Sequence, residues 1–156
     1  MKEILQIILF VFPTLLFGQK NMTNEPWEIG CDTVGGTQLE MNICSYESYL
    51  IADSILTELN KELTKYFETD LMKERGFIDS PKDSIQIDYV NVLESQLTAF
   101  KKSINDFYEY RKNISEVMRF QYYGGTISPL VVNTYALSLT VNQIATMRIM
   151  IEEIKK

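Results

Sequence analysis

The chain has 156 residues and no histidine, and its 21 acidic side chains outnumber 15 basic ones to give a net charge of −6. Without histidine, Ser-His-Asp and Cys-His catalytic arrangements are excluded and the commonest metal ligand is missing, so we expect no catalytic residues, metal site or cofactor. The charge argues against nucleic-acid binding, which requires a basic face, and it permits a basic protein partner without predicting one.

Residues 1–18 have the pattern of a secretory signal peptide. Lys2 supplies a positive start, an almost unbroken apolar run covers residues 4–17, and Gly18 is a small residue at the expected cleavage site. The run is shorter than the roughly 20 apolar residues that span a bilayer, and it contains Pro13. An uncleaved N-terminal anchor is the alternative. We therefore predict a periplasmic or secreted protein that starts at Gln19 and keeps no stable membrane anchor after cleavage.

Residues 19–36 are polar and irregular, and we predict an extended N-terminal arm. The arm contains Trp27, the only tryptophan, which we expect to cover the end of the helical core. In an exported chain an even pair of cysteines usually forms a disulfide, so Cys31 is predicted to bond to Cys44. The segment from Cys31 to Thr37 can reach about 20 Å when extended, which lets the arm fold back along the first helix.

Residues 37–156 are predicted to form one helical domain. A first helix should begin at Thr37, because Thr37 and Glu40 have the spacing of a capping box, and its apolar pattern continues to about residue 71. Residues 75–83 favour turns. A second helix should run from Ser84 to Gly124-Gly125, and its length leaves a kink or an interruption open.

The third helix should open with Ser128 as the capping residue and Pro129 at the first helical position. All three helices carry apolar side chains at helical spacing, which predicts an all-α fold of three long helices in an antiparallel bundle. The expected core stripes are Leu39, Ile43, Tyr46, Leu50, Leu56, Leu59, Leu63, Tyr66 and Phe67 in the first helix; Ile87, Val90, Leu93, Leu97, Phe100, Ile104, Phe107, Ile114 and Met118 in the second; and Leu130, Leu137, Thr140, Ile144, Met147, Ile151 and Ile154 in the third.

Two charged residues stand among apolar neighbours, and buried charges usually need partners. We predict that Arg111 on the second helix pairs with Asp53 or Glu40 on the first, the alternative being an Arg111 side chain whose head reaches water. Glu58 and Glu62 join Asp53 and Glu40 as carboxylates that a hydrolase would need, but solvated helix faces explain most of them. Four tyrosines before the glycine pair are interpreted as core or end packing rather than as a binding surface; they are Tyr108, Tyr110, Tyr122 and Tyr123.

These residues together resemble the lysozyme inhibitor LprI-like domain family, also known as DUF1311, from about Cys31 to Ile154. The first half of the resemblance consists of Cys31, Thr37, Glu40-Met41-Asn42, Cys44, Tyr49, Ala52-Asp53, Leu56 and Leu59-Asn60. The second half consists of Phe107-Tyr108-Glu109-Tyr110-Arg111, Gly124-Gly125-Thr126-Ile127-Ser128-Pro129-Leu130, Leu139-Thr140 and Arg148.

The chain departs from the family pattern at four positions. The family often has tryptophan in place of Phe107, glutamine in place of Ile104, and two further cysteines where this chain has Ser115 and Tyr135. The joint absence of those two cysteines supports a Cys31–Cys44 bond without a second bridge. The resemblance implies a small exported helical domain that is not an enzyme, with a protein partner of the lysozyme type. An adaptor or structural module with another envelope partner is the alternative.

Overall fold

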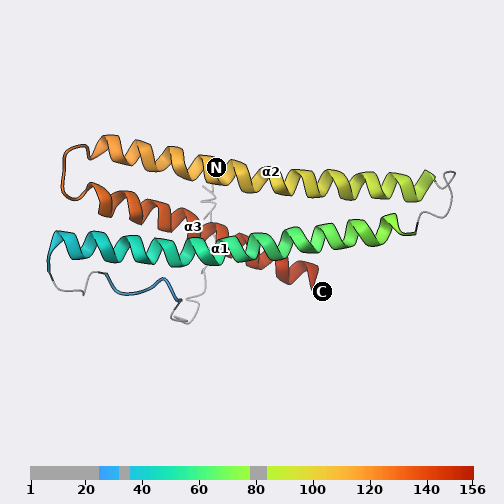
Figure 1. The fold of residues 1–156 in the computed structure, drawn as a ribbon, viewed down its shortest axis with the longest axis horizontal. Coiled ribbons are helices and arrows are strands. Elements are labelled where there is room, and N and C mark those ends of the chain that lie inside the picture. Colours follow the sequence, from blue (N-terminus) through green and yellow to red (C-terminus); the bar gives the residue numbers. More distant parts are fainter. Residues whose placement is uncertain (1–24, 32–35, 78–83) are drawn as a thin grey trace, which may run out of the picture.

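The computed structural model describes residues 25–31, 36–77 and 84–156. Three helices account for most of them: α1 (Gln38–Arg75), α2 (Ser84–Gln121) and α3 (Ser128–Ile154). Successive helices run antiparallel, so α1 and α3 point the same way, and α2 turns into α3 at the end of the bundle where α1 begins (Figure 1). The predicted all-α bundle is confirmed, whereas residues 1–18 and part of the predicted arm lie outside the described residues. Within the described ranges, no helix combines the length and the hydropathy needed to cross a bilayer.

The helix boundaries follow the local sequence signals with one exception. The backbone N–H of Glu40 donates to Thr37 Oγ1 at 3.3 Å and the N–H of Thr37 donates to Glu40 Oε2 at 3.2 Å, so the predicted capping box is present. α2 is continuous over 38 residues and is not interrupted. The predicted cap of α3 is wrong: Ser128 is already helical, Ile127 occupies the cap position, and no side chain caps this end.

The core lies along the axis between the helices. Leu56, Leu63 and Ile144 are at most 1% exposed, and they pack with residues of α2 that the helical pattern marked. The stripes predicted for α2 and α3 are confirmed as buried or half-buried side chains. Burial of this kind contributes about 25 cal/mol per Å² of apolar surface, and it is the main stabilising contribution in a bundle without strands.

The predicted stripe of α1 is wrong in its first half. Leu39 and Ile43 are 67% and 50% exposed, and Tyr46 and Leu50 are exposed as well. In the second half, Tyr66 is also exposed. The buried face of the first half is formed by small side chains instead, namely Cys44, Ser45, Ser48 and Ala52. Small residues let α1 and α3 approach closely, so the larger apolar side chains on the opposite face are left in solvent.

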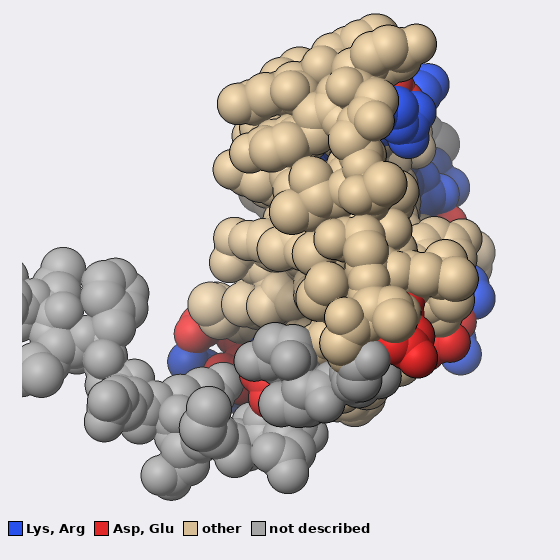
Figure 2. Space-filling view, turned by 90° about the vertical axis from the view of Figure 1, so that its left-hand side faces the viewer, with Lys and Arg blue, Asp and Glu red and all other residues tan. Residues whose placement is uncertain are grey.

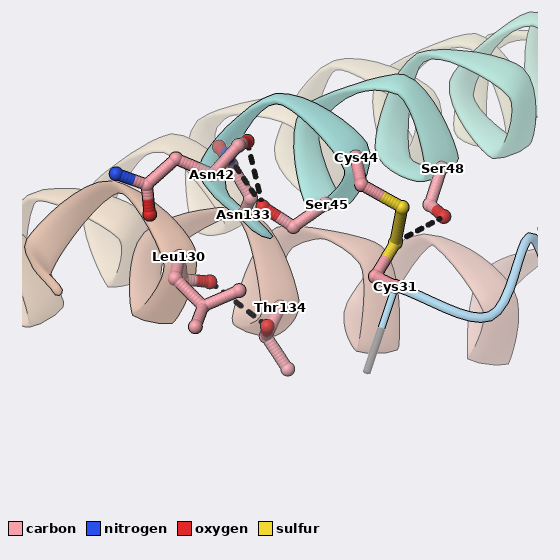
Figure 3. Close-up of a disulfide and its surroundings, with 8 residues drawn as sticks. All are labelled: Cys31, Asn42, Cys44, Ser45, Ser48, Leu130, Asn133 and Thr134. Atoms are coloured by element: carbon pink, nitrogen blue, oxygen red, sulfur yellow. Dashed lines mark hydrogen bonds between the residues drawn. A yellow bond between two sulfur atoms is a disulfide. The ribbon is translucent and has the colours of Figure 1, made fainter. Parts of the chain in front are cut away.

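The N-terminal arm is fastened to this small-residue face. A disulfide joins Cys31 to Cys44 with a Cα–Cα distance of 5.4 Å, as predicted (Figure 3). The Ser48 hydroxyl donates to Cys31 Sγ at 3.6 Å, since a disulfide sulfur has no hydrogen to give. Next to Cys44, the amide of Asn133 on α3 donates to Ser45 Oγ at 3.1 Å. Polar contacts and the disulfide therefore hold the arm, α1 and α3 together here.

Candidate functional site

A buried cation joins the three helices near the middle of the bundle. Arg111 is 8% exposed, and its Nη1 donates to Asp53 Oδ1 at 2.6 Å and to Thr140 Oγ1 at 2.8 Å. Thr140 is fully buried, and its own hydroxyl proton goes to the Ala136 carbonyl, which leaves its oxygen free to accept from Arg111. The predicted pairing of Arg111 with Asp53 is confirmed, whereas Glu40 is occupied by the capping box.

Aromatic rings enclose the same guanidinium. Its carbon atom lies 5.2 Å from the Tyr49 ring centroid, 5.5 Å from Phe107 and 4.9 Å from Tyr108, distances at which a cation is attracted to ring faces. Burial raises the pKa of the Tyr49 hydroxyl above its ordinary value of 10.0 despite the opposing effect of nearby Arg111. Arg111 binds Asp53 of α1 and Thr140 of α3 at the same time, so the cluster acts as a structural clamp between the three helices.

The glycine pair Gly124-Gly125 and the side-chain amide of Asn42 meet at the α2–α3 turn. Gly124 has φ +76°, a left-handed conformation that lets α2 end and the chain reverse. The Asn42 side chain donates to the Thr126 carbonyl at 3.2 Å and accepts from Gln38 at 2.9 Å. The turn is thereby tied to the first turns of α1, and Gly125 follows within it. Met41 beside Asn42 is half-buried.

The third motif cluster attaches the arm to α3. Arg148 donates through both terminal nitrogens to the Glu25 carboxylate, at 2.8 and 3.2 Å, and lies 5.6 Å from the ring of Trp27. The hydrogen bond with Glu25 raises the pKa of the Arg148 guanidinium. Trp27 is 6% exposed and packs against the side of α3 between Val141 and Arg148, so our expectation that it covers an end of the bundle is wrong.

Among the described residues, Asn60 has a buried side-chain oxygen, Oδ1, without a hydrogen-bond partner. The residue is 7% exposed at the α1–α2 contact, beside Ile104 and Tyr108. Its backbone carbonyl accepts from the Thr64 hydroxyl at 2.7 Å.

Of the carboxylates considered for acid–base chemistry, Glu58 and Glu62 lie on the same surface of α1, one turn apart, and Asp53 and Glu40 lie elsewhere. Asp53 is bound to Arg111 and Glu40 to Thr37, while Glu58 and Glu62 lie on the outer surface of α1. Lys61 binds Glu58 at 2.7 Å and Lys155 binds Glu62 at 3.2 Å, with both carboxylates more than half exposed. Solvated ion pairs of this type do not give two carboxylates the different environments that acid and base roles require.

The end of the bundle at the α2–α3 turn presents a different surface, which we call the end patch. It consists of Leu39, Phe120, Tyr122, Tyr123 and Ile127, which are 38–86% exposed. No charged residue occurs from Phe120 to Met147. Seen end-on, this face is almost free of charged side chains, which lie at its margins (Figure 2). Contiguous apolar surface on a soluble domain usually marks an interaction site, and aromatic residues are enriched in protein interfaces.

The exposed tyrosines correct one interpretation, and the end patch adds Phe120, which the sequence analysis did not single out. Tyr110, Tyr122 and Tyr123 are 54%, 38% and 86% exposed, so only Tyr108 of the four tyrosines packs as expected. Phe120 and Leu39 join them from different helices. The uncharged run after residue 119 was the one signal in the sequence for this surface. Which of its side chains are exposed depends on how the α2–α3 turn is placed in the fold.

In comparisons with known proteins, no protein-family model, no curated protein and no solved structure matches this chain.

Proposed function

We propose that this chain is an exported, non-enzymatic binding protein of the lysozyme inhibitor LprI-like type, and that it contacts a lysozyme-type enzyme through the end patch. The observation that carries the proposal is the protruding aromatic turn at one end of the bundle. Tyr123 is 86% exposed beside the Gly124-Gly125 turn, and Phe120 is 73% exposed at the end of α2. Exposed aromatic side chains on a braced turn lose little conformational entropy when they bind.

The internal motif residues support the same proposal in another way. The residues of the family resemblance are dispersed in sequence, yet several of them meet in the fold: Asp53, Arg111 and Thr140 form the buried clamp, and Asn42 holds the turn through Thr126. A clamp and a tied turn keep the end patch in a fixed geometry, which lowers the entropic cost of binding.

Charge would add to the rate of association. The chain carries a net charge of −6 outside an uncharged contact face, and a basic enzyme would be attracted to it over a distance of about 10 Å at ordinary ionic strength. The expected complex therefore has an apolar centre and a charged margin. Added salt should slow its formation more than it speeds its dissociation.

The test is inhibition of a panel of purified lysozymes of different structural types by protein exported and processed from the full-length chain. We expect dose-dependent inhibition of at least one type, with an inhibition constant that rises at least tenfold in Tyr123→Ala and in Phe120→Ala, because buried interface aromatics often contribute more than about 1.4 kcal/mol. Ile149→Ala is the matched control, since Ile149 is 60% exposed on α3 away from the turn. Inhibition that is indifferent to both aromatic substitutions would refute the end patch as the contact.

A second candidate is an adaptor with another envelope partner, and the breadth of the apolar surface favours it. Beyond the end patch, exposed Ile43, Tyr46 and Leu50 continue along the outer face of α1. If no lysozyme binds, a photo-crosslinking residue at position 123 should capture one dominant protein in cells, and the same residue at position 149 should not. Crosslinks of equal strength at both positions would speak against this candidate.

A further inference from the structure

At the opposite end of the molecule, none of the described residues covers one side of α1 and α2. α3 ends beside Glu62 and Tyr66 of α1, where Lys155 binds Glu62 at 3.2 Å and the last turn of α3 lies against Tyr66. α1 continues to Arg75, about 14 Å beyond Tyr66 at 1.5 Å per residue. α1 and α2 therefore project beyond α3 as a two-helix hairpin (Figure 1). A small separate core of Leu71, Val90 and Leu93 holds the two helices together there.

One side of the hairpin is the side that α3 would cover if it were longer. On α2, this side is apolar. Ile85, Tyr89 and Val92 are 82%, 48% and 61% exposed, and their i, i+4, i+7 spacing places them on one face of the helix. The other flank of α2 carries Glu94 and Lys101, which pair with α1. These ion pairs mark the outer edge of the α1–α2 contact. The apolar side lies away from them, on the side of α2 that packs against α3 nearer the C-terminal end of α2.

On α1 the same side combines an aromatic ring with two opposite charges. Tyr66, Asp70 and Lys73 again have the spacing i, i+4, i+7, and Tyr66 lies at the end of α3. Neither Asp70 nor Lys73 forms an ion pair with any residue that the structure describes. We call the surface made by these three residues of α1 and by Ile85, Tyr89 and Val92 of α2 the hairpin face.

We propose that the hairpin face binds the hairpin face of a second copy of this chain, antiparallel and about a two-fold axis, to form a four-helix bundle at the centre of a dimer. The α3 helices dictate the direction, because a parallel arrangement would bring both of them to the same place. In the antiparallel arrangement, the hairpin of each copy ends beside the last turn of the other copy's α3.

Charge complementarity fits this occupant. A two-fold axis that passes α1 midway between Asp70 and Lys73 sets Asp70 of each copy opposite Lys73 of the other. One self-complementary pair of residues therefore provides two ion pairs, as an isologous contact requires. The same axis passes α2 near Val92, because Leu71 packs with Val90 and Leu93. It brings the Val92 side chains of the two copies together, and Tyr89 and Ile85 of each copy lie against the α2 helix of the other further from the axis.

The available area is sufficient for a stable dimer. Aromatic side chains bury about 150–250 Å² each, and Ile and Val side chains bury less, so the exposed fractions of Tyr66, Ile85, Tyr89 and Val92 leave about 400 Å² of apolar surface per copy. Interfaces are a little over half apolar by area, which gives a total of roughly 1,400 Å² for the two copies. Stable specific interfaces bury about 1,200–2,000 Å². The dimer would carry its two end patches at opposite ends of one rod and could bind two partners.

The experiment is sedimentation equilibrium of the protein processed from the full-length chain, over a concentration series reaching about 100 µM, with circular dichroism as the check on folding. We expect a monomer–dimer equilibrium whose dissociation constant rises at least tenfold in Val92→Lys. Met72→Lys is the matched control, since Met72 is 68% exposed in the same hairpin but on another face of α1, and it should leave the constant within about threefold.

Charge reversal tests the register. Asp70→Lys and Lys73→Asp should each weaken the dimer about threefold to tenfold, and the double variant should return to within about threefold of the original constant. A chain that stays monomeric over the whole series would overturn the proposal. So would a dimer that Val92→Lys leaves intact, one that Met72→Lys weakens equally, or a charge pair without mutual rescue. None of these readouts depends on lysozyme binding.

Discussion

Replacing Arg111 with methionine tests whether the buried clamp holds the bundle together. The substitution keeps much of the side-chain length but removes the charge, the 2.6 Å bond to Asp53 and the 2.8 Å bond to Thr140. It also leaves Asp53, whose side chain is 29% exposed, without its cation. Removing one partner of a buried pair costs about 3–5 kcal/mol, and the partial exposure of Asp53 places the expected loss near 3 kcal/mol.

The assay is urea unfolding followed by circular dichroism. With a slope of about 1.5 kcal/mol per molar urea, a loss of about 3 kcal/mol lowers the midpoint by about 2 M. Asp53→Asn should cost a similar amount, because it leaves the Arg111 charge buried with only Thr140 and the aromatic rings. The double variant should cost about 2 kcal/mol less than the sum of the single variants, since it no longer contains an unpaired charge.

Arg119→Met is the control for this cycle. Arg119 pairs with Glu116 at 2.7 Å, but its side chain is 57% exposed, so its loss should change stability by less than about 0.5 kcal/mol. The reasoning would be refuted if Arg111→Met were no more harmful than Arg119→Met, or if the effects of Arg111→Met and Asp53→Asn were simply additive.

Three further predictions concern the disulfide, the turn and the buried tyrosine. Replacing Cys31 and Cys44 with serine should lower the free energy of unfolding by about 3 kcal/mol, or Tm by roughly 10 °C. It should also abolish the effect of a reductant on Tm. An unchanged Tm would contradict this. Gly124→Ala should cost about 1 kcal/mol in urea unfolding because of its positive φ, whereas Gly125→Ala, which has no such φ, should cost clearly less; equal costs would contradict this. The folded-state pKa of Tyr49 is raised, so the stability that its hydroxyl contributes is fully present below pH 10.0 and is lost as the pH rises through the folded-state pKa. Tyr49→Phe should therefore flatten the fall of the urea midpoint between about pH 9 and pH 11. Identical slopes in the two proteins would contradict this.

Local sequence signals determined the helices and part of the motif geometry. The Thr37–Glu40 capping box is made by residues three apart, and the α2 and α3 stripes depend only on helical periodicity, so neither required knowledge of the tertiary fold. The Cys31–Cys44 bond followed from there being two cysteines in a chain with an export pattern. The pairing of Arg111 with Asp53 could be foreseen because a charge among apolar residues needs a partner.

Tertiary structure alone decided which faces the helices use. In the first half of α1, two stripes compete, and the smaller side chains around Cys44 and Ala52 are buried because α3 approaches closely there. Leu39 and Ile43 are left in solvent for the same reason, although hydrophobicity ranks them as core. Such a choice depends on the neighbouring helix and cannot be made from the periodicity of one segment.

Both proposed binding surfaces also depend on distances that are not local in sequence. The end patch exists because the tie between Asn42 and Thr126 brings the α2–α3 turn to the first turns of α1. The hairpin face exists because α3, with 27 residues against 38 in each of the other helices, ends before they do. The sequence by itself determined three amphipathic helices and their internal partners. The relative lengths and placement of the packed helices decided which apolar side chains remain available to other molecules, because a side chain is buried only where another element covers it.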